Sequence, residues 1–297
     1  MDNKTVLITG GAGFVGSHVV DKFCDEGFDV IVVDNMVTGK IENLNPKAKF
    51  YHCDITTNAL EEVFKETNPD YVIHLAAQIS VVNSMNNPEK DASINIMGSI
   101  NLLKYAKKYG VKKFIAASSA AIYGNLPAPI EENVIPQPMS PYGLSKLTME
   151  KYIELSGLDY LIFRFSNVYG ERQSAGGEAG VVTIFENAMK NNLPVTIYGN
   201  GEQVRDFVFV KDIANITFKL LNSNVKNEII NISTNDGITI NELFNSLKRK
   251  YNYSQKPNYK DSRAGDIDVS ILSNRKLVSL IGNYDFCRDL NGEKVNA

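Results

Sequence analysis

Two residues in the middle of the chain have the types and the spacing that acid–base chemistry needs. Tyr142 and Lys146 lie four apart in a predicted helix, for which Ser140 and Pro141 suit the cap and the first position. A free tyrosine titrates near pH ~10, too high for a base at neutral pH. Because a lysine ammonium and the positive end of a helix both favour phenolate, we expect the pKa of Tyr142 to be lowered enough for acid–base work. On its own, such a pair is also common on solvated helix faces.

A glycine-rich turn near the N-terminus indicates where a cofactor would bind. Residues 5–9 form a short apolar run typical of a strand buried on both faces, and Gly10, Gly13 and Gly16 follow where that strand turns into a helix. Residues without Cβ let backbone N–H groups approach a diphosphate at a helix N-terminus. Asp34 closes the next strand, where a carboxylate accepts ribose hydroxyls and disfavours a 2′-phosphate. The pattern predicts a dinucleotide site, for NAD rather than NADP.

Strand and helix patterns alternate from residue 5 to about residue 164, which predicts how these groups are positioned. Strands are expected at 5–9, 30–34, 49–53, 71–75, 114–117 and 160–164, and helices at 14–23, 60–66, 88–109 and 140–156. Such alternation is typical of an α/β fold with a doubly wound parallel Rossmann sheet. We predict an NAD-binding domain over 1–168 and a smaller C-terminal α/β substrate lobe over 169–297, part of which, around 204–232, returns to the first domain.

Two further strands end in residues that suit a flat or polar ligand. Asp54 and Ile55 follow the third strand, where an adenine ring could lie, and Ala76 and Ala77 follow the fourth, where small side chains allow a close approach. The residues that these patterns place against the cofactor are Gly10, Gly13, Phe14, Val15, Gly16, Asp34, Asn35, Asp54, Ile55, Leu75, Ala76, Ala77 and Gln78.

The composition excludes several classes of partner. The 297 residues, 43% hydrophobic and 22% charged, are typical of a globular protein. A net charge of −3 favours neither nucleic acid nor a membrane surface, and we expect no signal peptide and no membrane span. Cys24, Cys53 and Cys287 lack metal-ligand spacing, so no metal site is expected. They are predicted to be reduced thiols of a cytoplasmic protein.

Several segments together resemble a known family. They are residues 9–16, 74–78, 118–124, 140–146, 167–170, 198–201, 205–207 and 263–266. In these segments the sequence resembles the extended short-chain dehydrogenase/reductase superfamily, and within it the NAD-dependent epimerase/dehydratase family, close to the UDP-glucose 4-epimerases. The resemblance covers the chain to about residue 275 and is highly specific to the superfamily.

The resemblance implies a hydride-shuttle mechanism on a nucleotide-sugar, with a UDP-hexose as the expected substrate. Tyr142 would take the proton from the sugar 4-hydroxyl while the C4 hydride passes to NAD. Lys146 would hold the nicotinamide ribose, and Ser119 would hydrogen-bond the reacting oxygen. The 4-keto sugar would then turn over and receive the hydride on its other face.

The resemblance also implies roles in holding the substrate. Asn167, Arg205 and Arg263 match positions that hold the substrate diphosphate, and Asn95 matches a polar position beside cofactor and substrate. Ser270 matches the position beside the hexose C2 substituent. A small residue there would admit an N-acetyl group.

More than one reaction fits these residues. The leading hypothesis is an NAD-dependent 4-epimerase that interconverts UDP-glucose and UDP-galactose and extends to their N-acetyl forms. An alternative is an NAD(P)-dependent nucleotide-sugar 4-keto reductase or dehydrogenase with the same three residues. A catalytically silent NAD-binding regulator is a third, against which the intact Ser119, Tyr142 and Lys146 argue. Related dehydratases carry acidic residues where Ala120 and Ala121 stand, which disfavours dehydration.

A homodimer is expected from two helices that are apolar beyond one face. The residues concerned are Ile94, Met97 and Ile100 on the first helix and Leu144, Leu147 and Met149 on the second. Such a helix usually covers the sheet with one side and meets a partner with the other. In the family that the sequence resembles, two such helices from each subunit form a bundle.

Overall fold

The computed structural model describes residues 4–174, 180–262, 267–287 and 290. Within them the chain divides into two compact units. Unit 1 comprises the described residues of Met1–Gly124, Ile135–Arg164 and Ile213–Ile230, and unit 2 those of Asn125–Val134, Phe165–Asp212 and Asn231–Ala297. The predicted division at residue 168 into functional domains stays a prediction.

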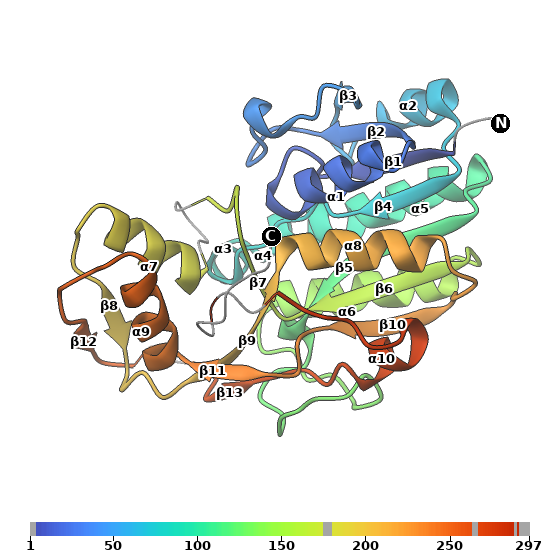
Figure 1. The fold of residues 1–297 in the computed structure, drawn as a ribbon. Helices are drawn as coiled ribbons and strands as arrows, with labels where there is room; N and C mark the ends of the chain where they lie inside the picture. Colours follow the sequence, from blue (N-terminus) through green and yellow to red (C-terminus); the bar gives the residue numbers. More distant parts are fainter. Residues whose placement is uncertain (1–3, 175–179, 263–266, 288–289, 291–297) are drawn as a thin grey trace. The chain divides into compact units, whose positions relative to one another are not determined.

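A seven-stranded sheet forms the centre of unit 1 (Figure 1). Its strands, in spatial order, are β10 (Glu228–Ile232), β6 (Tyr160–Phe165), β5 (Lys113–Ser119), β4 (Tyr71–His74), β1 (Thr5–Thr9), β2 (Asp29–Asp34) and β3 (Lys49–His52). β1 lies between β2 and β4 and pairs with both in parallel. From β1 the chain adds β2 and β3 on one side and then β4, β5 and β6 on the other. This strand order is the doubly wound arrangement, so the predicted fold class is confirmed.

Helices cover both faces of this sheet. On one face α2 (Leu60–Thr67), α5 (Ser99–Lys108) and α6 (Pro141–Leu155) pack on strand residues such as Leu7 and Phe114. On the other, Phe23 of α1 (Phe14–Asp25) meets Phe218 of α8 (Val210–Leu221), with ring centroids 5.6 Å apart. Successive strand residues point to opposite faces, which explains why these strands read as continuous apolar runs.

The helix predicted over 88–109 contains an irregular turn. It consists of α4 (Pro88–Ala92), a π-helical turn η2 (Ser93–Gly98) and α5, and it follows a short helix α3 (Val81–Asn86) that was not predicted. π turns occur frequently at functional sites. Here the turn carries Asn95.

Unit 2 is built from small sheets and helices. β9 (Val204–Phe209) pairs with β7 (Asn167–Tyr169), β11 (Gly237–Thr239) and β13 (Val269–Ser270), while β8 (Thr196–Tyr198) pairs with β12 (Asn258–Lys260). Its apolar core joins α7 (Val181–Lys190) and α9 (Ile240–Lys250), where the Phe185 and Phe244 rings meet edge to face. A last helix, α10, spans Arg275–Ile281. The described helices include none that is long and apolar enough to cross a membrane.

Candidate active site

Helix α6 begins as the sequence predicts. The Ser140 hydroxyl accepts a hydrogen bond from the Gly143 N–H at 3.1 Å, and Pro141 occupies the first turn. Tyr142 and Lys146 follow one helical turn apart and are both buried, with exposed fractions of 9% and 3%. The pair therefore does not lie on a solvated helix face.

The end of strand β5 lies against this part of α6. Ser119 is the last residue of β5, and its hydroxyl is hydrogen-bonded with the Tyr142 phenol. Two residues earlier, the carbonyl of Ala117 accepts a hydrogen bond from Lys146 Nζ at 2.9 Å. The structure thus brings together Ser119, Tyr142 and Lys146, which are up to 27 positions apart in the sequence.

Burial sets the proton affinity of both groups on α6. It raises the pKa of Tyr142, and the nearby Asp91 carboxylate raises it further, while the Ser119 hydrogen bond lowers it. Our expectation of a lowered pKa for Tyr142 was therefore wrong, because the cost of burying phenolate exceeds the help of its neighbours. Burial lowers the pKa of Lys146 to about 8, although the negative charges of Asp91 and Glu150 act to raise this pKa.

The turn between β1 and α1 leaves space at a helix N-terminus. Gly13 is the residue before α1, and among the described residues no side chain caps this helix end. A Cβ on Gly16 would lie 2.0 Å from the Gly10 carbonyl oxygen, so the turn must be tight there. A Cβ on Gly13 would meet only that same oxygen, at 3.2 Å. The protein's own packing does not fill the space at Gly13, and a diphosphate would suit it.

Asp34 is held at the end of β2 beside this turn. One carboxylate oxygen accepts the Ala12 N–H at 3.0 Å, and the other accepts the Met36 N–H at 2.8 Å. Next to it, Asn35 Nδ2 donates to Asp54 Oδ2 at 2.8 Å. Burial alone would raise the pKa of Asp54, but hydrogen bonds from Thr56 and Asn35 lower it overall. These carboxylates are fixed as acceptors in the region where an adenosine was expected.

A buried histidine ties β1 to the end of β4. The Ser99 hydroxyl donates to the Asn95 carbonyl at 2.6 Å, so its oxygen accepts from His74 Nε2, which lies 2.9 Å away. His74 Nδ1 then accepts from the Thr9 hydroxyl at 2.8 Å. Burial lowers the pKa of His74 to about 3. His74 is therefore a neutral structural residue that connects Thr9 of β1 with Ser99. The Thr9 hydroxyl oxygen also accepts the Ala76 N–H at 3.2 Å.

Asn95 and Gln78 are joined by two reciprocal hydrogen bonds, from the Asn95 side chain to the Gln78 backbone. Asn95 Oδ1 accepts the Gln78 N–H at 2.8 Å, and Asn95 Nδ2 donates to the Gln78 carbonyl at 2.9 Å. Asn95 Nδ2 also lies 3.1 Å from the hydroxyl of Ser145, which donates to the Tyr142 carbonyl at 3.0 Å. The π turn and the end of β4 are thereby joined to the first turn of α6. Asp91 belongs to this network, and no sequence motif pointed to it.

Three predicted substrate residues share one face of the second sheet. Ser270 pairs with Arg205 across β13 and β9, and Asn167 pairs with Phe207 across β7 and β9. Paired residues, and residues two apart on one strand, point to the same side of a sheet. Asn167, Arg205 and Ser270 therefore lie on the same face. Arg263 lies outside the described residues.

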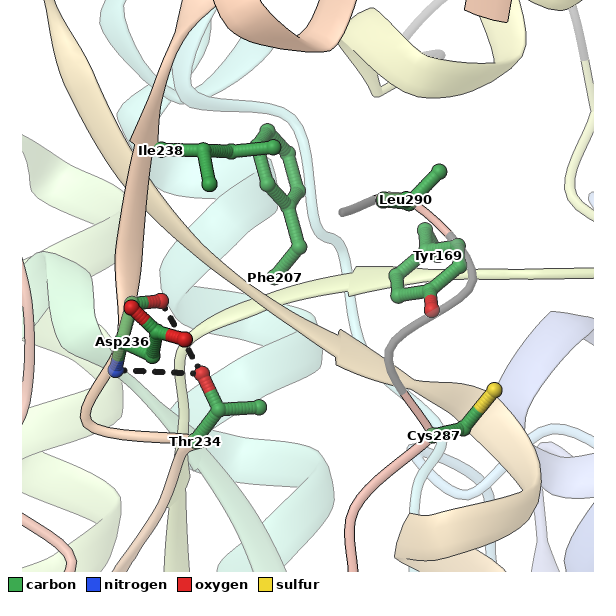
Figure 2. A pocket seen from close by; sticks show the side chains of 7 residues that line it. All are labelled: Tyr169, Phe207, Thr234, Asp236, Ile238, Cys287 and Leu290. Atoms are coloured by element: carbon green, nitrogen blue, oxygen red, sulfur yellow. Dashed lines mark hydrogen bonds between the residues drawn. The ribbon is translucent and has the colours of Figure 1, made fainter. Parts of the chain in front are cut away.

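A small pocket opens on that face (Figure 2). It is lined by Tyr169, Phe207, Thr234, Asp236, Ile238, Cys287 and Leu290. Tyr169 and Phe207 each lie two residues after a predicted substrate residue on the same strand. The Thr234 hydroxyl donates to Asp206 Oδ1 at 2.6 Å and accepts the Asp236 N–H at 3.2 Å. The cavity of about 20 Å³ has room for about one water, so it is too small for a sugar.

Comparison with known proteins decides the family. The sequence pattern of the NAD dependent epimerase/dehydratase family matches residues 6–233. The chain belongs to this family. The match includes the glycine turn, Ser119, Tyr142 and Lys146, and the predicted resemblance is confirmed.

Family members of known structure and sequence cover nearly the whole chain. A putative UDP-glucose 4-epimerase of Methanocaldococcus jannaschii is 45% identical over 93% of this chain and 92% of its own. The structure of a Thermotoga maritima UDP-glucose 4-epimerase with UDP-glucose is 45% identical, with a TM-score of 0.94 over 97% of this chain and 96% of its own. A UDP-N-acetylglucosamine 4-epimerase from Methanobrevibacter ruminantium, in complex with UDP-N-acetylmuramic acid, is 36% identical, with a TM-score of 0.89 over 96% and 93%.

NAD is the cofactor of this epimerase/dehydratase family, and the residues present fit it. The uncapped N-terminus of α1 and the open side of Gly13 suit a diphosphate, and Asp34 presents a carboxylate at the end of the next strand. The described residues contain no cluster of histidine, cysteine and acidic side chains that would hold a metal ion.

Proposed function

We propose that this protein is an NAD-dependent nucleotide-sugar 4-epimerase that acts on UDP-hexoses. The observation that carries the proposal is the buried group formed by Ser119, Tyr142 and Lys146, in a chain 45% identical to a UDP-glucose 4-epimerase over 97% of its length. A hydroxyl, a phenol and an ammonium gathered at one strand end suit removal of a proton from an alcohol as its carbon loses a hydride.

Each of the three residues has a separate task in this reaction. Tyr142 takes the proton from the sugar 4-hydroxyl and later returns it to the 4-keto oxygen. Ser119, whose hydroxyl is hydrogen-bonded with Tyr142 in this structure, would turn this hydrogen to the same sugar oxygen when the substrate binds. Lys146 supplies the positive charge beside them. NAD, when bound, accepts and returns the C4 hydride and adds a positive charge that favours the Tyr142 phenolate.

The cofactor-binding residues divide by the part of NAD that they would hold. The turn from Gly10 to Gly16 would hold the diphosphate, and Asp34 the adenosine ribose. Ile55, which is 5% exposed, and the Asp54–Asn35 pair would border the adenine. The remaining residues of this proposal are Phe14, Val15, Leu75, Ala76, Ala77, Gln78, Asn95, Tyr142 and Lys146.

The substrate would be held by polar residues of unit 2. We assign the diphosphate to Asn167, Arg205 and Arg263, and the sugar C2 substituent to Ser270. The shared face of Asn167, Arg205 and Ser270 supports this assignment. The likeness to a UDP-N-acetylglucosamine 4-epimerase supports N-acetylated hexoses as further substrates.

A homodimer and a cytoplasmic location belong to the same proposal. Five exposed apolar side chains form what we call the α3–α6 surface, and the helices that carry them pack together. They are Val81, Val82, Met85, Met97 and Leu144. Exposed apolar side chains on helices that pack together suit contact with a second copy of the chain. Met149, which we also expected at the interface, is 1% exposed and belongs to the core, so that expectation was wrong.

All three cysteines are free thiols, which suits the proposed cytoplasmic location.

The substitution Tyr142→Phe tests the proposed chemistry. It removes the phenol and keeps the ring, so NAD should still bind while epimerase turnover falls at least about 10²-fold, the usual contribution of general acid–base catalysis. Tyr152→Phe is the matched control, because Tyr152 lies on the same helix and is 44% exposed. Turnover near the wild-type rate in Tyr142→Phe would refute the role of Tyr142.

A further inference from the structure

Asp91 is a buried carboxylate that the reaction as described does not use. It lies on α4 and is 1% exposed. Its two hydrogen bonds, both to Oδ1, come from neutral amides: Gln78 Nε2 at 2.7 Å and Asn95 Nδ2 at 3.1 Å. Among the described residues no basic side chain pairs with it. A buried charge without an ion pair is costly, so its presence calls for a compensating role.

The other buried carboxylate of this region differs in this respect. Glu150, one turn after Lys146 on α6, is fully buried but is paired with Arg164 through two hydrogen bonds of 3.0 and 2.7 Å. That pairing offsets much of its negative charge. Asp91 is therefore the carboxylate whose charge acts on the site without a counter-ion in contact.

A short chain of contacts connects Asp91 to the helix of the catalytic residues. Asn95 Nδ2 reaches both the Asp91 carboxylate and the Ser145 hydroxyl, each at 3.1 Å. Ser145 lies between Tyr142 and Lys146 in the sequence and donates to the Tyr142 carbonyl. Two charged groups act on the pair: Asp91 from α4 raises the pKa of both residues, and Glu150 from α6 raises the pKa of Lys146. His74 from β4 is a titratable neighbour of Lys146 but is neutral.

We propose that Asp91 is a positioning residue that holds the Gln78–Asn95 pair against α6 and supplies the negative charge that keeps Lys146 an ammonium ion. The role rests on the proposed epimerase function, in which Lys146 must be charged. The charge matters because burial brings the pKa of Lys146 down to about 8, close to neutral pH. A negative charge favours the protonated form of every group near it, so Asp91 opposes loss of the proton from Lys146 and from Tyr142 alike.

The test is the pH dependence of Asp91→Asn, which removes the charge and keeps the shape. Because the pKa of both groups should fall, both limbs of the pH–kcat profile should move to lower pH by about one unit, at the lower end of what one nearby charge does. Asp91→Glu, which restores the charge, should return both limbs to the wild-type positions. Glu89→Gln, which removes an exposed carboxylate from the same helix, should leave them unmoved.

A second measurement does not depend on turnover. The phenolate absorbance of Tyr142, taken as the difference between each protein and its Tyr142→Phe version, should titrate at lower pH in Asp91→Asn. If Asp91→Asn is insoluble, Asp91→Ser, also small and uncharged, carries the same expectation. A slower enzyme with unmoved limbs and an unmoved phenolate titration would overturn the proposal. An inactive wild-type protein whose phenolate titration still shifts would count against the epimerase function alone.

Discussion

At the scale of single residues, burial from water sets the pKa values of the titratable groups in the candidate site. Tyr142 and Lys146 are both buried, and burial disfavours the charged form of each. The raised pKa of Tyr142 keeps the free phenol protonated near neutral pH, whereas the lowered pKa of Lys146 brings the amine within reach of deprotonation. The site therefore relies on charges brought close to it, from Asp91 and from the cofactor.

Our proposal assigns the choice of sugar to a single residue, Ser270. Ser270 lies opposite Arg205 on neighbouring strands, so the two side chains share a face of the sheet. We expect Ser270→Tyr to abolish turnover of UDP-N-acetylglucosamine, because the added ring fills the space for the N-acetyl group, while turnover of UDP-glucose is largely kept. Steady-state rates on the two sugars measure this.

The control for Ser270→Tyr is Ser270→Ala, which keeps the residue small and should turn over both sugars. If Ser270→Tyr loses both activities equally, or neither, Ser270 does not determine the choice of sugar.

At the scale of elements, the close approach of α6 to the end of β5 brings together the three proposed catalytic residues. A Cβ on Gly143 would lie 2.5 Å from the carbonyl oxygen of Ala121, which follows Ser119 in the turn after β5. Backbone cannot yield as a flexible side chain does. A side chain at position 143 would therefore push the first turn of α6, which carries Tyr142, away from the turn that follows Ser119.

We expect Gly143→Ala to lower kcat by about 10²-fold, because a displacement near 1 Å of catalytic groups costs about that much. Gly27→Ala is the control. Gly27 lies just after the C-terminal end of α1, with φ +78° and no atom within 4 Å of an added Cβ, so alanine there strains the backbone away from the site. It should lower the melting temperature and leave kcat unchanged. A Gly143→Ala enzyme with a normal kcat would show that this approach is not required.

The elements that local signals define could be predicted from the sequence. The apolar runs of the strands, the glycine turn and the Ser140 cap each act within a few residues, and the structure has them as expected. The π turn at Ser93–Gly98 could not be predicted, because Asn95 is held there by Gln78 and Ser145, which lie 17 and 50 positions away. The pKa of Tyr142 was missed for the same reason, since burial depends on the whole fold.

At the scale of the whole molecule, the α3–α6 surface predicts the oligomeric state. Leu144 lies on this surface and is 55% exposed. Leu144→Glu should convert the dimer to a monomer, because a dimer would have to bury the new carboxylate in an apolar interface. Light scattering at micromolar concentration measures the mass. Leu193→Glu, at an exposed position of unit 2, should remain a dimer. A monomeric wild-type protein would contradict the proposal.

The reaction itself gives the most direct test of the central claim. The purified protein is incubated with UDP-glucose and no added reductant, and the sugar products are identified by NMR, with UDP-N-acetylglucosamine and with dTDP- and GDP-glucose in parallel. An epimerase that regenerates its own NAD should convert UDP-glucose to a mixture with UDP-galactose. Unchanged UDP-glucose, or activity that appears only with a 4-keto sugar and added NAD(P)H, would contradict the claim and indicate the reductase instead.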